Sequence, residues 1–175
     1  MEVKSAITTA IAFEKKVRDV YADASKTVKT PEGRKVLEML AKEEQQHIIY
    51  LQERLKEWTT SGKLTVGDLP SRVPSETVIR KGVERITSHL DSSRKDVADP
   101  ESELRILERA LHVETETSDF YQKMVDSLTD DARNMFSRFL EIEKGHLAIV
   151  KAEIDAVSDM GFWFGLPEFD LEIQG

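Results

Sequence analysis

The chain has 175 residues, a third of them charged, and a formal net charge of -8, so its length suits one domain with a sizeable core. The acidic balance argues against nucleic acid as a partner, because neutralising phosphates needs a basic patch. The sequence has no cysteine, which excludes disulfides, thiolate zinc sites, iron–sulfur clusters and a thiol nucleophile, and leaves Glu, Asp and His as ligands for any metal.

Nothing in the sequence suggests a membrane protein. No apolar run approaches the roughly 18 residues that a helix needs to span a bilayer. The first residues, MEVKSAITTAIAFEKK, carry an acid beside the start and further charges soon after, unlike a signal peptide. We therefore expect a cytoplasmic protein without a membrane partner.

Long segments with helical periodicity lie between sparse glycines and prolines, and no strand pattern of any length appears. The sequence therefore predicts an all-α fold. The expected helices span residues 3–28, 31–60, 75–92, 100–128 and 130–158. Their start signals are Thr30 as N-cap with Pro31 at the first helical position, Ser75, Asp99 with Pro100, and Thr129.

An internal repeat pairs the four long helices. The segment AFEKKVRDVY matches HVETETSDFY at an offset of 100 residues, and LAKEEQQH matches FLEIEKGH at an offset of 99. The repeated unit is a helix hairpin with Glu and Tyr on its first arm and Glu-x-x-His on its second. The aligned pairs are Glu14 with Glu114, Tyr21 with Tyr121, Glu44 with Glu143, and His47 with His146.

The repeated glutamates and histidines lie on the apolar faces of their helices. The apolar face of helix 31–60, for example, carries Leu40, Glu44 and His47. A buried carboxylate is costly unless it is paired or bound to metal, and four of them at repeat-related positions suggest a common partner. Glu43 competes with Glu44 as the acid that precedes His47. The repeat and the apolar face both favour Glu44, and Glu43 is expected to face away from the core.

The four glutamates also lie at matching heights. In each hairpin the two glutamates are about 15 residues from the predicted turn, roughly 22 Å at 1.5 Å per residue. If the hairpins pack with opposite sense, the four side chains meet near the middle of the bundle. Residues 61–98 are more than a tight hairpin connection needs, and they suit a crossover that carries the 75–92 helix along the bundle.

Two helices thus supply one Glu each and the other two supply a Glu-x-x-His motif each, which is the ligand set of the di-iron and di-manganese carboxylate bundles. Four carboxylates neutralise two divalent ions, and two imidazoles complete a mixed shell that suits Fe(II) or Mn(II). A purely structural polar layer is the alternative. The predicted metal ligands are Glu14, Glu44, His47, Glu114, Glu143 and His146.

On these motifs the sequence resembles the ferritin-like di-iron proteins, and among them the rubrerythrin group, over residues 3–158. The resemblance implies a ferritin-like four-helix bundle of two repeat-related hairpins, filling residues 1–160 and joined by the long crossover. The aromatic tail, residues 161–175, is expected to pack on the bundle or, alternatively, on the second subunit of a homodimer. The resemblance also implies that Glu44 and Glu143 bridge two metals, that Glu14 and Glu114 are terminal ligands, and that His47 and His146 bind one metal each.

The cofactor that the resemblance implies is a pair of iron ions, with manganese or a mixed pair as alternatives. The implied activity is that of an oxidoreductase that reduces peroxide or O2 under oxidative stress, with electrons from a separate donor protein. Two other functions stay open, namely iron handling of the ferroxidase type and a metal-free helical interaction protein. Rubrerythrins usually add a rubredoxin domain with four cysteines, and this chain has no cysteine.

Some further side chains bear on the site. Tyr21 matches a tyrosine that rubrerythrins place beside the cluster. Tyr21 and Tyr121 are expected either to hydrogen-bond the ligands or to be core tyrosines with satisfied hydroxyls. Rubrerythrins carry a further metal-site Glu where this chain has Thr117, whose hydroxyl could hydrogen-bond a ligand or a water molecule. His89 and His112 are expected at the surface or in local hydrogen bonds.

Overall fold

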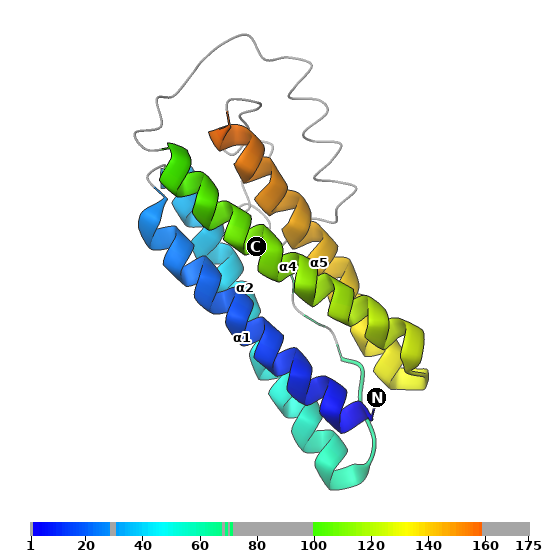
Figure 1. Ribbon diagram of the computed structural model, residues 1–175. Helices are drawn as coiled ribbons and strands as arrows, with labels where there is room; N and C mark the ends of the chain where they lie inside the picture. Colours follow the sequence, from blue (N-terminus) through cyan, green and yellow to red (C-terminus); the bar gives the residue numbers. More distant parts are fainter. Residues whose placement is uncertain (1, 29–30, 68, 70, 72–99, 159–175) are drawn as a thin grey trace.

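The computed structural model describes residues 2–28, 31–67, 69, 71 and 100–158 (Figure 1). The described residues form four long helices, α1 (Val3–Thr27), α2 (Pro31–Ser61), α4 (Pro100–Ser127) and α5 (Asp130–Val157). Each boundary differs from the predicted one by at most one residue, and the predicted all-α class is confirmed. The helix predicted at 75–92 and the tail at 161–175 lie outside the described residues.

Two prolines and a threonine lie at helix starts in the described residues. Pro31 and Pro100 are the first residues of α2 and α4, as predicted, because the first turn has no intrahelical acceptor for the N–H that proline lacks. Thr129 is the N-cap residue of α5, as predicted, but its side chain makes no cap hydrogen bond. Its hydroxyl donates to Oδ2 of Asp130 at 2.8 Å, and Asp130 has a left-handed φ of 52°. Thr30, Ser75 and Asp99 lie outside the described residues.

Figure 1 shows two antiparallel hairpins, α1 with α2 and α4 with α5, and α1 also packs along α4. The start of α4 lies at the opposite end of the bundle from the end of α2, so these two helices run in the same direction. The hairpins therefore have opposite sense, as the predicted crossover requires. This arrangement brings the middle of all four helices to one level.

Two apolar clusters fill the bundle, one toward each end, and in every helix the predicted site residues fall between them. The site therefore lies in the middle of the bundle, away from bulk water. The cluster near the α1–α2 turn includes Val17, Ala24, Leu40, Val113 and Val150. The cluster at the other end includes Ile7, Leu51, Met124, Phe136 and Phe139.

Within the described residues, no helix combines the length and the apolarity that crossing a membrane requires.

Candidate metal centre

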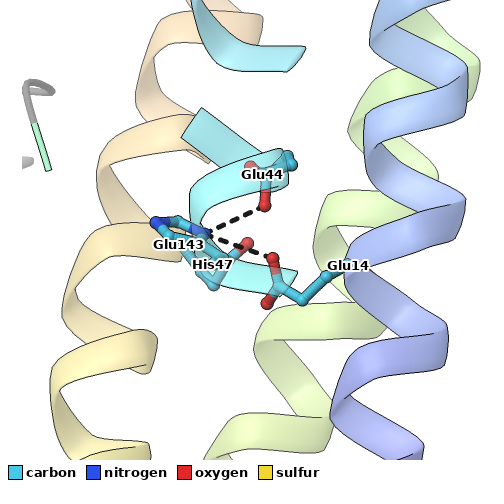
Figure 2. Close-up of side chains that lie close together, drawn as sticks. All are labelled: Glu14, Glu44, His47 and Glu143. Carbon is cyan, nitrogen blue, oxygen red and sulfur yellow. Dashed lines mark hydrogen bonds and ion pairs between the residues drawn. The ribbon is translucent and has the colours of Figure 1, made fainter. Parts of the chain in front are cut away.

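All six predicted site residues come together in the middle of the bundle. Each is fully buried, and they form two groups whose possible ligand atoms all lie within 4.8 Å of one another. Both groups include Glu44 and Glu143, so these two carboxylates lie between two adjacent positions for a cation. One group is Glu14, Glu44, His47 and Glu143 (Figure 2), and the other is Glu44, Glu114, Glu143 and His146.

The carboxylate of Glu44 lies between the two imidazoles. Its Oε2 atom is 3.0 Å from Nδ1 of His47, and its Oε1 atom is 2.7 Å from Nδ1 of His146. Nδ1 of His47 is also 3.2 Å from Oε2 of Glu14, which reaches across from α1 (Figure 2). The two rings are stacked, with centroids 5.8 Å apart and an angle of 11° between their planes. Both histidines thus turn Nδ1 toward the carboxylates.

Several polar atoms of the cluster have no hydrogen-bond partner in the part of the chain that the structure describes. The contact between Glu44 and His146 is short, but it lacks hydrogen-bond alignment. Buried polar groups are nearly always paired, and an unpaired buried carboxylate is costly. Carboxylate oxygens and an imidazole nitrogen left in this way fit a divalent cation such as Fe(II) or Mn(II). The atoms are Oε1 of Glu44, Oε2 of Glu114, both carboxylate oxygens of Glu143 and Nδ1 of His146.

Protons balance the charges of the metal-free cluster. Burial and the charge of Glu44 raise the pKa of Glu14 from 4.5 to about 8, and burial with the charge of Glu114 raises the pKa of Glu143 well above its usual value. Burial disfavours the charged form of His47, but the neighbouring carboxylates outweigh it and raise its pKa from 6.5 to about 10. Burial likewise disfavours ionised Glu44, but the two histidines outweigh it and lower its pKa. A bound cation would displace these protons.

Two tyrosines connect the hairpins crosswise. The Tyr21 hydroxyl on α1 donates to Oε1 of Glu114 on α4, and the Tyr121 hydroxyl on α4 donates to Oε1 of Glu14 on α1. Burial, followed by the nearby carboxylates, raises the pKa of each phenol well above its usual value of 10.0, so both tyrosines stay protonated donors. Each tyrosine therefore has a satisfied hydroxyl and at the same time holds a predicted ligand in place.

Replacing Tyr121 with phenylalanine is expected to lower the melting temperature of the metal-free protein. The ring stays in the core, but the buried Glu14 oxygen loses its donor, which costs about 1–3 kcal/mol. At about 2–4 °C per kcal/mol for a chain of this size, circular dichroism can measure the shift. Tyr21→Phe removes the equivalent bond to Glu114 and is expected to give a shift of similar size. Unchanged melting temperatures in both variants would show that the crossed bonds do not stabilise the bundle.

The expectation that Glu43 faces away from the core is wrong. Its side chain is buried, and its Oε2 atom lies 3.4 Å from Nε2 of His146 on α5. α2 packs against α1 on one side and contacts α5 through aromatic rings on another, so its buried surface is wider than one apolar stripe. The repeat could not reveal this contact, because the position aligned with Glu43 holds Ile142. Glu44 is the more central acid, as predicted.

Two other predicted positions play smaller parts. Thr117 is fully buried, but its hydroxyl donates to the backbone oxygen of Val113 at 2.8 Å. Because a hydroxyl has one proton, Thr117 in this arrangement does not donate to a carboxylate. His112 is exposed, and its Nε2 atom lies 3.6 Å from Oε1 of Glu116 on the same helix, so it is a local surface contact as expected. His89 lies outside the described residues.

The chain is similar to known proteins over most of its length. The family profile described as Rubrerythrin matches residues 5–154. A solved structure of a hypothetical protein from Pyrococcus furiosus is 16% identical, with a TM-score of 0.65, and the similarity covers 93% of this chain and 94% of that chain; at this identity it shows the fold alone. No curated protein sequence matches the chain significantly. Because the family match covers residues 5–154 of the 175, the chain belongs to the rubrerythrin family, within the ferritin-like di-iron carboxylate superfamily.

Proposed function

We propose that the buried cluster binds two iron ions and that the protein uses them to reduce peroxide. The observation that carries the proposal is the sharing of Glu44 and Glu143 between two groups of possible ligands, because two adjacent cations need anions between them to offset their repulsion. Membership of the rubrerythrin family supports a di-iron carboxylate centre. The proposed terminal ligands are Glu14 and His47 for one ion, and Glu114 and His146 for the other.

The buried groups suit two divalent ions in charge and in chemical type. Four carboxylates offset the four positive charges of two such ions inside an apolar bundle, where uncompensated charge would be costly. Neutral imidazole and carboxylate ligands together suit Fe(II), with Mn(II) as the alternative. Both oxygens of Glu143, which have no hydrogen-bond partner among the described residues, would gain partners when the ions bind.

A ferrous pair held by these residues would supply two electrons, enough with two protons to convert one hydrogen peroxide into two water molecules. The contribution of the chain is to orient the ligands and to keep bulk water away. Tyr21 and Tyr121 hold the two terminal carboxylates through their hydroxyls. Phe139 packs edge-on against His47 with ring centroids 5.3 Å apart, and Tyr121 packs on Phe139 at 5.1 Å. Aromatic rings thus line the site on the side of the apolar cluster that lies away from the α1–α2 turn.

The proposed reaction also needs electrons to restore the ferrous state. The 175 residues contain no cysteine, so they cannot build the four-cysteine iron site of a rubredoxin, whose iron is held by thiolates. We therefore propose a separate electron-donor protein as a partner.

The proposal predicts that reduced, iron-loaded protein is oxidised much faster by hydrogen peroxide than by O2. The measurement is stopped-flow absorbance of the ferric product after anaerobic Fe(II) loading, with at least about a tenfold difference expected, equivalent to about 1.4 kcal/mol in the activation barrier. Metal analysis of the loaded protein should give about two iron ions per chain. Zn(II)-loaded protein is the control, because zinc fills the site but has no redox chemistry.

Other results would support other functions. A preference for O2 with iron retained in large excess would favour iron handling, which the Thr117 departure from the rubrerythrin pattern makes the second candidate. A protein that stays metal-free after anaerobic loading would contradict both metal functions, and would leave a helical interaction protein with a polar core layer.

A further inference from the structure

The two halves of the cluster differ at the position directly before the aligned glutamates of α2 and α5. Glu44 aligns with Glu143 and His47 with His146, but the residue before each glutamate is Glu43 in the first half and Ile142 in the second. The six ligand types and the crossed tyrosine bonds, by contrast, occur in both halves. The difference therefore concerns the outer side of the histidines, meaning the Nε2 side of each ring, which faces away from Glu44.

Glu43 contacts only one of the two histidines of the cluster. Its Oε2 atom is 3.4 Å from Nε2 of His146, at the long end of hydrogen-bond distance, and both side chains are buried. Nε2 of His47, by contrast, has no hydrogen-bond partner among the described residues. Both rings direct Nδ1 at the same carboxylate, Glu44. Both imidazoles thus lie against Glu44 through Nδ1, and they differ in what Nε2 contacts.

This contact has a direct consequence for a metal bound at Nδ1. When Nε2–H of His146 donates to the Glu43 carboxylate, the proton stays on Nε2 and the Nδ1 lone pair is free for the metal. A carboxylate behind a metal-bound histidine also fixes the ring and makes it a stronger donor, and its loss typically costs about 10–100-fold in metal affinity. His47 has no such carboxylate in the described residues, so its tautomer and orientation depend on the inner contacts alone.

From this geometry we infer that the two metal positions are unequal, and that Glu43 makes the position at His146 the tighter one, filled first. Glu43 is a positioning residue in this scheme, because it acts on the metal through His146. The inference rests on the proposed function, since it assumes that the cluster binds two metals. It adds an order of filling that neither the ligand set nor the repeat contains.

Titration of the metal-free protein with Co(II) tests the inference. Cobalt absorption reports the ligand environment of each added ion, and isothermal titration calorimetry gives the affinity of each step. The full chain is expected to bind the first ion more tightly than the second. Glu43→Leu removes the acceptor and is expected to weaken the first step by about 10–100-fold and leave the second nearly unchanged. Glu43→Gln keeps an oxygen acceptor in the same volume and is expected to recover part of the lost affinity.

A substitution in the other half is the matched counterpart. Ile142 lies on α5 at the position that the repeat equates with Glu43, and it is partly buried. Ile142→Glu is expected to place a carboxylate behind His47, strengthen the second step and bring the two affinities together. The exposed neighbour Glu141 supplies the control, because Glu141→Gln changes a charge beside this position without facing a histidine and is expected to leave both steps unchanged.

The outcomes separate the inference from the function on which it rests. Two ions bound with one affinity, or an equal loss in both steps in Glu43→Leu and Glu43→Gln, would overturn the inference and leave the two-metal site intact. Failure of the unchanged protein to bind any Co(II) would overturn the proposed site itself. Circular dichroism of each metal-free variant checks that it is folded. If Glu43→Leu does not fold, Glu43→Gln against Ile142→Glu still decides the question.

Discussion

A Glu44→Ala variant is expected to bind less than one divalent ion per chain, where the unchanged protein is expected to bind about two. Glu44 belongs to both groups of possible ligands, and its two oxygens lie 3.0 and 2.7 Å from Nδ1 of His47 and of His146. Alanine therefore removes a ligand from each position and the anion between the two ions. Losses at both positions at once distinguish this substitution from the removal of a terminal ligand.

Metal content after anaerobic Fe(II) loading and desalting measures this effect. Glu38→Ala is the control, because Glu38 is an exposed acid on the same helix and its loss changes the net charge by the same amount. The control is expected to keep its metal and its melting temperature. If Glu44→Ala retained two tightly bound ions, the assignment of Glu44 as the acid between the metals would be refuted.

Raising the pH from about 6.5 to about 9 is expected to destabilise the metal-free protein and to increase the stabilisation that metal provides. Glu14 has a folded pKa of about 8 against 4.5 unperturbed, and His47 has about 10 against 6.5. Both pKa values are raised, so their contribution to stability is complete below the unperturbed values and is lost as the pH rises through the folded ones. The pKa of Glu44 is shifted the other way, to below 4.5, so Glu44 is ionised throughout this range and adds no slope.

Thermal unfolding at several pH values gives the measurement. The melting temperature of chelator-treated protein is expected to fall by at least about 5 °C over this range. The protein loaded with Mn(II) is expected to fall less, because metal binding needs the deprotonated ligands that high pH supplies. Glu14→Gln is the matched variant, since glutamine resembles the protonated acid at every pH, and its metal-free form is expected to show a flatter profile. A metal-free melting temperature that rises with pH would contradict the proposed charge balance.

Much of this fold follows from local patterns in the sequence. Pro31 and Pro100 mark helix starts because proline fixes the first turn, and the long apolar stripes indicate the main buried face of each helix. The repeat was the more informative pattern for the site. It identified the same residue types at the same heights in both hairpins, and the structure brings all six together in one buried cluster.

The contacts that the sequence did not predict are those that depend on the packing of one helix against a second neighbour. Glu43 is one residue away from the apolar stripe, and only the closeness of α5 buries it against His146. The crossed bonds of Tyr21 and Tyr121 join residues of different hairpins, and periodicity within a helix carries no information on such pairs. Thr129 is at the predicted N-cap position, but side-chain preferences determine neither the φ of Asp130 nor the acceptor of the Thr129 hydroxyl.

The crossed tyrosine bonds have a consequence for how such a centre could arise. Each hairpin supplies a Glu, a Tyr and a Glu-x-x-His motif, and each Tyr serves the Glu of the other hairpin. One short hairpin used twice about a twofold axis, as in a homodimer of identical hairpins, would therefore supply the whole set. Two halves fused in one chain need not keep identical sequences, as the subunits of such a homodimer must. Each half can change its sequence independently, so a carboxylate such as Glu43 can stand behind one histidine while Ile142 occupies the equivalent place in the other half.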